Sequence, residues 1–316
     1  RALSMLLGYR YERIDNKDFV SDQRATNHIV RFEATYSFPI WERGLSGRLK
    51  RGDALRPMTP PRAPRAEQAP DIDPDEVVST QYVRRLLQDT GTILTSPLRW
   101  DTRDWLTVAG VGLTAGGLMV ADHGIRNYLQ KKRTNDTADV SQVLRPFGSF
   151  IPAALMAGMH VTGHAFDLPR LKAASADALE ASLITAGAIV LPMKFLTGRS
   201  RPDQNEGSAQ YTPFHLGTSL PSFTTAHAFS VASVLSEHFS NPAVSVLSYG
   251  LAGAVGLTRI HDDKHWTSDV FLAAVIGTAV GKAVVKLNEK RRESSRVSVV
   301  PLLGEGIQGA ALRVEF

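Results

Sequence analysis

Long uncharged runs rich in Gly and Ala constrain the fold of this chain more than any other feature. Small residues let helices pack closely, above all in lipid, so these runs favour a helical domain. All are shorter than the ~20 residues that cross a bilayer comfortably. They therefore fit either the buried helices of a soluble bundle or short membrane spans extended by flanking polar residues, and we favour the membrane. The five runs are Trp105–Ala121, Phe147–Gly163, Ala181–Met193, Asn241–Thr258 and Val270–Gly281.

Charge and cysteine content narrow the range of functions. The 316 residues carry a net charge of +5, but the basic residues cluster in one Pro-rich segment and around a few motifs, without interleaved aromatic residues. This pattern argues against a nucleic-acid partner and favours an anionic lipid surface or a phosphorylated substrate. The absence of cysteine excludes disulfides and thiolate chemistry. Because the first residue is Arg1, we expect a processed or truncated N-terminus.

The two ends of the chain differ from its middle. Within residues 1–44, apolar and polar residues alternate over Leu7–Glu12 and Val30–Phe38, which predicts the two strands of a hairpin. Such aromatic alternation resembles the last hairpin of an outer-membrane barrel; an ordinary amphipathic hairpin packed on the helical domain is the second interpretation. Residues 291–316 begin with a basic stretch and return to alternation, which predicts a C-terminal hairpin with Gly304–Gly306 in its turn.

Two further segments are expected between these ends. Residues 45–75 contain six prolines and many arginines, a composition typical of an extended linker. Residues 76–290 show helical patterning that is interrupted by loops with Pro and Gly. The sequence therefore predicts an all-α domain over 76–290, preceded by the linker and flanked by short β-hairpin segments at both ends of the chain.

Three short stretches gather the residue types that hold a phosphate and attack it. They supply a lysine, two arginines, a serine and several histidines, and each lies beside an apolar helical run. One such match alone is a weak signal, whereas three in order and spaced by tens of residues are a strong one. The stretches are KFLTGRSRP (Lys194–Pro202), PSFTTAH (Pro221–His227) and TRIHDDKHWTSD (Thr258–Asp269).

The spacing within these stretches predicts how the side chains meet. Lys194 and Arg201 are seven residues apart, almost two helical turns, so we expect both to project from one face of a helix that Pro202 stops. Arg259 adds a third cation. Phosphoryl transfer depends chiefly on neutralising the charge of the non-bridging oxygens, and these cations suit that task.

A histidine and a carboxylate follow at helical spacing. His265 and Asp269 are four residues apart, so the carboxylate is predicted to bond one ring nitrogen and leave the other free for attack. A metal site is the alternative, because His261, His265 and Asp269 step by four along one predicted helix face. That interpretation leaves the three cations without a role, so we expect neither a metal nor an organic cofactor.

These motifs resemble those of the type 2 phosphatidic acid phosphatase (PAP2) superfamily, which includes lipid phosphatases, bacterial acid phosphatases and vanadium haloperoxidases. Its pattern is K-x6-R-P, then P-S-G-H, then S-R-x5-H-x3-D. The first element is complete here, and in the third only Thr258 replaces a serine. The resemblance covers roughly residues 88–288, and TSPLRWD (Thr95–Asp101) looks like its Gram-negative members. It implies a helical bundle with about six core helices.

The resemblance also implies roles for individual residues. His265 would be the nucleophile that forms a phosphohistidine, and Asp269 would hold its tautomer and stabilise the imidazolium. The second element departs from the family, because Phe223 and Thr224 stand where the family has glycine and the acid histidine. His227, about one helical turn further on, is the predicted general acid, with a packing histidine as the alternative. The predicted phosphate-binding residues are Lys194, Arg201, Ser222 and Arg259.

The sequence therefore predicts a phosphatase that hydrolyses a phosphomonoester or pyrophosphate of a lipid or polyprenyl substrate. A catalytically degenerate protein that binds phosphate headgroups is the alternative, because the second motif is altered, and a vanadium haloperoxidase is a further one. We expect the protein in the bacterial cell envelope, in the inner membrane with a site facing the periplasm; association with the outer membrane is the alternative.

Overall fold

The computed structural model falls into two compact units, residues 1–72 with 290–316 and residues 73–289. The predicted linker over 45–75 and most of the predicted turn at Gly304–Gly306 lie outside the residues that the structure describes. Side chains are described for residues 77, 79–215 and 219–294. The described backbone comprises residues 5–14, 27–36, 77, 79–215, 219–304 and 307–314.

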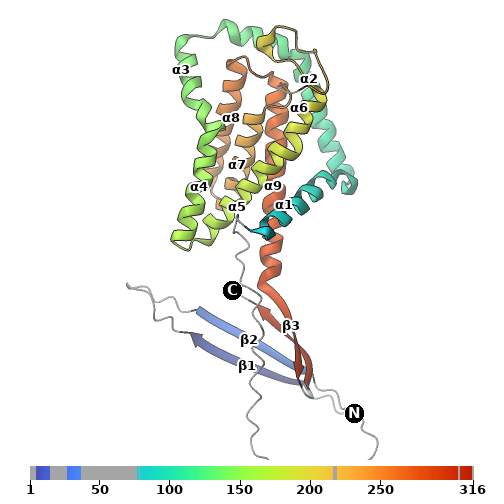
Figure 1. Cartoon of the computed structure of the whole chain (residues 1–316), viewed down its shortest axis with the longest axis vertical. Coiled ribbons are helices and arrows are strands. Elements are labelled where there is room, and N and C mark those ends of the chain that lie inside the picture. Colours follow the sequence, from blue (N-terminus) through green and yellow to red (C-terminus); the bar gives the residue numbers. More distant parts are fainter. Residues whose placement is uncertain are drawn as a thin grey trace, which may run out of the picture. The chain divides into compact units, whose positions relative to one another are not determined.

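The second unit is built of helices (Figure 1). The predicted all-α class is confirmed, and all five uncharged runs lie largely within helical segments. Asp101 caps the helix that follows it: its side chain accepts a 2.9 Å hydrogen bond from the backbone N–H of Asp104, and the Asp104 side chain accepts from the backbone N–H of Asp101 in a capping box. The helices are α1 (Thr80–Leu94), α2 (Thr102–Lys131), α3 (Asn135–Leu144), α4 (Phe150–Ala165), α5 (Pro169–Leu183), α6 (Leu191–Thr197), α7 (Phe223–Phe239), α8 (Pro242–His261) and α9 (Thr267–Arg296).

Four shorter helical turns join or interrupt these helices. One of them, η3, lies between α5 and α6 and winds as a π-helix, so that α5, η3 and α6 form one continuous segment. A π-turn uses more residues per turn than an α-helix and occurs frequently at functional sites. The four turns are η1 (Ser96–Arg99), η2 (Arg145–Gly148), η3 (Ile184–Val190) and η4 (Pro202–Gln204).

The described residues of the first unit form two antiparallel hairpins. Strand β1 (Met5–Ile14) pairs with β2 (Asn27–Tyr36), and β3 (Val297–Gly304) pairs with β4 (Ile307–Val314). The alternation in the sequence predicted both pairs. Whether the N-terminal hairpin belongs to an outer-membrane barrel stays a prediction.

Helix α7 packs centrally, against α5, α8 and α9. Its contact with α9 is close because α9 presents Gly277 and Gly281 to it. A Cβ added at Gly277 would lie 2.2 Å from the carbonyl oxygen of Ala226, and one at Gly281 would lie 2.7 Å from that of Ser230. This spacing of small residues is a common device for close helix packing in membranes.

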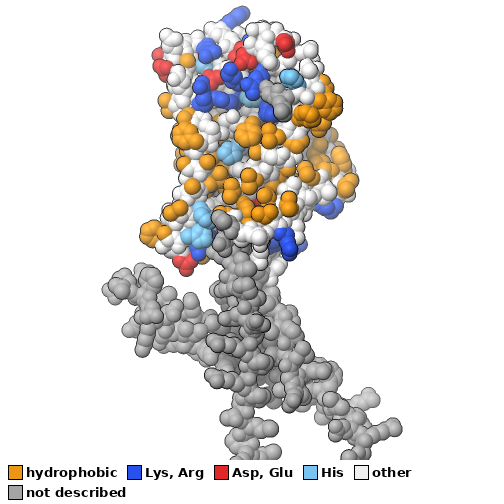
Figure 2. All heavy atoms as spheres, in the orientation of Figure 1, with side chains coloured by type: hydrophobic (Ala, Val, Ile, Leu, Met, Phe, Trp, Pro, Cys, Tyr) orange, Lys and Arg blue, Asp and Glu red, His pale blue; other side chains and the backbone are white. Residues whose placement is uncertain are grey.

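Among the described residues, four helical segments are long and apolar enough to cross a membrane. Each is longer than its uncharged run, because polar residues continue the helix beyond the C-terminal end of the run. Large apolar side chains on them face outward; Leu113 and Val120 are 79% and 88% exposed. Figure 2 shows hydrophobic side chains over the middle of this unit and charged ones gathered at one end. The chain is a membrane protein. The segments are Thr102–Lys131, Pro169–Thr197, Pro242–His261 and Thr267–Ser294.

Candidate active site

The first and third motifs meet at one end of the helical unit. The loop after α6 and the turn between α8 and α9 lie at the same end as the C-terminal part of α2 (Figure 1). The backbone N–H of Asp203 donates to the carbonyl of Asp263 at 3.1 Å, and the Nε of Arg126 donates to the Asp263 carboxylate at 2.7 Å. Segments about 60 residues apart in the sequence are thus fixed to one another.

Gly198 ends α6 earlier than the sequence analysis predicted. Its φ of +59° lies in the left-handed region, and an added Cβ would lie 1.6 Å from the carbonyl oxygen of Thr212. The chain then leaves the helix, so Arg201 precedes the short turn η4 instead of sharing a helix face with Lys194. The expected common helix was wrong; the two cations reach the site from a helix and from a loop.

Gly198→Ala should therefore cost at least about 2 kcal/mol in the free energy of unfolding, because the left-handed conformation alone costs about 1–2 kcal/mol and the Thr212 backbone must also move. Thermal unfolding in detergent measures this loss. Gly116→Ala in α2 is the matched control: nothing lies within 4 Å of the added Cβ, so it should be neutral or slightly stabilising. Equal behaviour of the two variants would contradict the account of Gly198.

His265 is buried at the centre of the predicted cations. Its Nδ1–H donates to the backbone carbonyl of Ser219 at 2.7 Å, and within the described part of the chain its Nε2 has no hydrogen-bond partner. Burial, together with the nearby charges of Lys194, Arg201 and Arg259, lowers the pKa of His265 well below its usual value. The ring is therefore neutral near pH 7, with Nε2 as its unprotonated nitrogen.

The three cations differ in the hydrogen bonds that they form within the protein. Lys194 is buried, and its Nζ donates to the Ser219 carbonyl at 3.4 Å. Arg259 is half-buried and bonds Thr258 and Asp262. The Nε of Arg201 is buried without a hydrogen-bond partner among the described residues. A buried guanidinium nitrogen that lacks an acceptor is a group that a bound anion would satisfy.

Asp269 lies beside His265 but does not hydrogen-bond to it. The distance from its Oδ2 to His265 Nδ1 is 3.9 Å, beyond a hydrogen bond, because Ser219 occupies that nitrogen. The predicted direct bond was wrong. The carboxylate instead accepts from the hydroxyl of Ser219, from the Trp266 backbone N–H at 2.9 Å and from Arg199 at 2.6 Å. Ser219 thus contacts both the Asp269 carboxylate and the His265 ring.

Arg199 links the site to α2 and was not predicted. It is fully buried and forms ion pairs with both Asp269, at 2.6 Å, and Asp122, at 2.8 Å. Its remaining donors reach the hydroxyl of Ser268 at 2.7 Å and the carbonyl of Ser208 at 2.7 and 2.9 Å. The guanidinium lies between two buried carboxylates and compensates the charge of both. Without it, each carboxylate would be a buried charge without a partner, which is strongly destabilising. The sequence signal was an additional arginine inside the first motif.

The second motif begins α7, but its predicted residues lie apart from one another. Ser222 is buried; its N–H donates to the Asp269 carbonyl at 3.3 Å and its hydroxyl pairs with Thr225 at 2.9 Å. The backbone N–H is thus engaged within the protein and the hydroxyl is paired with Thr225, whereas the sequence analysis predicted that Ser222 binds phosphate. Ser222 holds the start of α7 against the start of α9.

His227 lies on the η2 side of α7. It hydrogen-bonds the backbone at Gly148, and its ring is 6.5 Å from that of Phe223. Burial lowers its pKa, opposed by the Gly148 contact. Thr224 faces the same turn, since its methyl carbon would lie 2.3 Å from a Cβ at Gly148. Among the described residues, no hydrogen bond or ring contact of His227 reaches His265.

Asp262 organises the turn after α8. Its Oδ1 accepts from Ser141 at 2.7 Å and contacts the Nδ1 of His261 at 3.2 Å; its Oδ2 accepts from Arg145 at 2.9 Å and from Arg259 at 3.2 Å. Burial would raise the pKa of Asp262, but the bonds from Ser141, His261 and Arg145 lower it below its usual value. The carboxylate is therefore ionised near neutral pH and fixes Arg259.

The face expected for a metal does not form. Helix α8 ends at His261, the chain turns through Asp263 at a φ of +59°, and α9 begins only at Thr267. His261, His265 and Asp269 therefore belong to a helix end, a turn and a second helix, and they do not share one helix face.

The comparisons with known proteins agree with the motifs. The family model described as PAP2 superfamily matches residues 178–293, which include His265 and all three cations. Over these residues the chain is similar to the PAP2 superfamily. Over 108 residues, 34% of its length, the chain is 36% identical to a lipid A 1-phosphatase of Porphyromonas gingivalis. The chain spans 22% of that relative's length.

Two solved structures are similar over about half of the chain. One is LpxE from Aquifex aeolicus, with 20% identity and a TM-score of 0.42 over 52% of this chain and 94% of that one. The other is a transmembrane PAP2-type phosphatidylglycerolphosphate phosphatase from Bacillus subtilis, with 19% identity and a TM-score of 0.39 over 58% of this chain and 96% of that one.

Proposed function

We propose that this protein hydrolyses a phosphomonoester or pyrophosphate of a membrane lipid or polyprenyl substrate through a phosphohistidine on His265. The observation that carries the proposal is the environment of this ring: buried, neutral, held through Nδ1 by the Ser219 carbonyl, and surrounded by three cations. A lone histidine in a helical core has no need of such charges. A phosphate group would compensate them.

The geometry supports a two-step reaction. Nε2 of His265 attacks phosphorus and the bond from phosphorus to the lipid oxygen breaks, so the phosphoryl group passes to the ring and the oxygen leaves with a proton. Water then attacks phosphorus, the P–N bond breaks, phosphate departs and the proton of the water returns to the acid. Lys194, Arg201 and Arg259 hold the non-bridging oxygens throughout. Asp269, through Ser219, stabilises the imidazolium.

His227 is the proposed proton donor. It is the histidine of the second motif, it is half-buried on α7, and Thr224 in the family's acid position carries a hydroxyl that is a poor acid. Its contacts with Gly148 and Phe223 leave it on the η2 side of α7, so it must change rotamer to reach a leaving oxygen.

The altered second motif favours one other function, a phosphate-headgroup receptor without turnover. Both proposals place an anion among the same cations, so binding cannot separate them. Release of inorganic phosphate by purified protein from phosphatidic acid and a polyprenyl pyrophosphate in detergent does separate them. Turnover with an acid-labile phosphoenzyme supports the phosphatase; tight binding of vanadate without any phosphate release supports the receptor.

We further propose an inner-membrane location with the site facing the periplasm.

If His227 is the acid, activity should peak on the acid side of pH 6.5. His227 must be protonated, and burial lowers its pKa below 6.5, so the rate falls as the pH rises through that pKa. His265 must be neutral, and because its pKa lies well below 6.5, the rate falls again only at still lower pH. Profiles of kcat/KM for an alkyl phosphate test this. His227→Ala should lose the basic limb; a maximum above pH 7, or the same limb in the variant, would mean another acid.

A further inference from the structure

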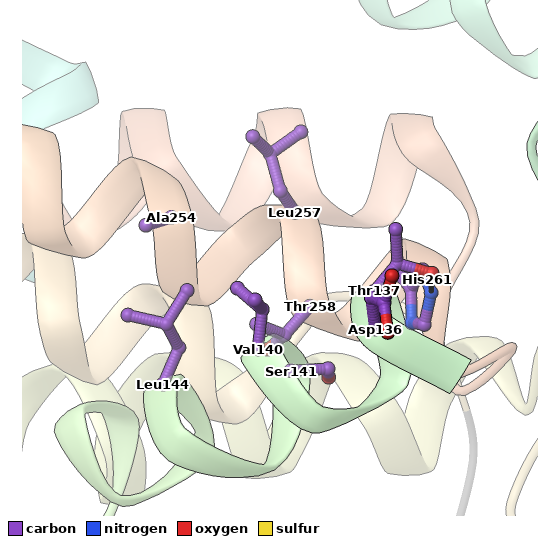
Figure 3. A pocket seen from close by; sticks show the side chains of 9 residues that line it. All are labelled: Asp136, Thr137, Val140, Ser141, Leu144, Ala254, Leu257, Thr258 and His261. Atoms are coloured by element: carbon purple, nitrogen blue, oxygen red, sulfur yellow. Dashed lines mark hydrogen bonds between the residues drawn. The ribbon is translucent and has the colours of Figure 1, made fainter. Parts of the chain in front are cut away.

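An open groove of about 350 Å³ runs between α3 and α8 (Figure 3). Along most of its length the side chains are aliphatic, and at one end they are polar. Figure 3 shows Thr137 and His261 gathered at that end, with the aliphatic side chains beyond them. We call it the α3–α8 groove. Its walls include Val140, Leu144, Ala254 and Leu257, and its polar end includes Asp136, Thr137 and His261.

The groove opens toward the surroundings of a membrane helix. Val140 and Leu257 on its walls are 58% and 65% exposed, and α8 is one of the four segments that are long and apolar enough to cross a membrane. A chain of methylene groups that lay along these walls would leave no polar group unsatisfied. The site is therefore suited to an apolar chain that enters sideways from lipid.

The polar end of the groove is joined to the proposed phosphate site by one carboxylate. Asp262 accepts from Ser141, which lines the groove, and contacts His261. The same carboxylate holds Arg259 at 3.2 Å and Arg145 at 2.9 Å. Thr258, which also lines the groove, is the neighbour of Arg259 in α8. Asp262 thus connects residues of the groove to a pair of cations.

We propose that the α3–α8 groove holds an acyl or alkyl chain of the phosphorylated lipid substrate while Arg145 and Arg259 face its anionic headgroup. The inference rests on the proposed function, because it takes the phosphate of the same molecule to be the reacting group. The groove and the cations together match an amphiphilic molecule, because an aliphatic wall is followed within one helical turn by a positively charged side chain. Half of the Arg145 side chain is exposed, so it can meet a headgroup without breaking its pair with Asp262.

The first test uses chain length. For short-chain phosphatidic acids that are monomeric in water, kcat/KM should rise by up to about fourfold for each methylene that enters the groove, the value expected for transfer of one CH₂ out of water. Ala254→Phe fills the groove and should lower kcat/KM for the long-chain lipid at least tenfold while nitrophenyl phosphate, which has no chain, stays within twofold. Leu257→Trp is a second blocking variant in case the first does not fold.

Val246→Phe is the matched control, since Val246 lies on the same helix, is 71% exposed and does not line the groove. It should leave both substrates unchanged. If the blocked variants handle long and short chains as the wild type does, the groove does not hold the chain.

The second test does not need turnover. A phosphatidic acid with a diazirine near the end of its acyl chain is crosslinked to the His265→Ala protein in phosphatidylcholine vesicles, and the labelled peptides are mapped. Labelling of α3 and α8 that Ala254→Phe removes supports the proposal. Equal labelling by a diazirine phosphatidylcholine would show an ordinary bilayer contact and overturn it.

The two tests distinguish the failure of each proposal. Groove labelling in a protein that releases no phosphate would leave the groove assignment standing and end the phosphatase proposal. Phosphate release without groove labelling would support the phosphatase proposal and overturn the groove assignment.

Discussion

His265→Ala should lower phosphate release at least about 10⁴-fold and abolish any acid-labile phosphoenzyme, because loss of a nucleophile removes the covalent route altogether. The side chain is buried beside Ser219, so folding must be checked independently by thermal unfolding. His164→Ala is the matched control: this histidine is exposed on α4 and far in sequence from all three motifs. It should keep full activity.

Two outcomes would contradict this assignment. A folded His265→Ala protein that still releases phosphate at the wild-type rate would exclude His265 as nucleophile. Loss of turnover with a phosphoenzyme still present would move the covalent step to another side chain.

Arg199→Met should destabilise the protein by about 3–5 kcal/mol, because removal of one partner leaves buried charges uncompensated. Asp122 and Asp269 are both fully buried and both pair with this guanidinium. Arg199→Lys should recover only part of the loss, since one ammonium cannot reproduce a fork that serves two carboxylates. Denaturant unfolding in detergent measures these differences.

The control is a pair at the surface of the same region. Lys264 contacts Asp203 at 2.8 Å with both side chains partly exposed, so Lys264→Ala should cost less than about 1 kcal/mol. Adding Asp122→Asn to Arg199→Met should restore part of the stability, since one of the orphaned charges is then removed. If Arg199→Met is as stable as the control, the buried pairs do not contribute as described.

The helical class and the residues around the phosphate site could be predicted from the sequence because both depend on local patterns. Uncharged runs with Gly and Ala predicted helices, and the three motifs predicted that His265 and its cations belong to one site. The prediction failed where a single residue changed the path of the chain. Gly198 carried a recognisable C-cap signal, but the regular spacing of Lys194 and Arg201 suggested a longer helix.

Other parts of the site depend on contacts between distant segments, which spacing does not reveal. Ser219 replaces Asp269 at the ring of His265, although it lies 46 residues away in the sequence. Asp122 meets Arg199 across 77 residues, from a helix without any motif. In each case two polar groups that are distant in the sequence form a hydrogen bond, and they meet only because the fold has brought their segments together. A pattern within one segment carries no information about such a partner.

The π-helical turn η3 lies within the continuous segment formed by α5, η3 and α6. The number of residues in this segment is therefore as important for the position of Lys194 as its composition. Lys194 follows η3 by four residues, so its direction depends on how many residues lie between it and the wide turn. Deletion of one residue within Ile184–Val190 would remove the residue that the wide turn accommodates, so the segment would wind as a continuous α-helix with Lys194 close to its present direction. Deletion of one residue from the α-helical stretch between the turn and Lys194 would instead swing Lys194 by about 100°, the rotation per residue of an α-helix. The helix would survive such a deletion, but its cation would face elsewhere. Single-residue insertions and deletions, more than substitutions, are therefore the changes by which chains of this kind would gain or lose this charge in the course of evolution.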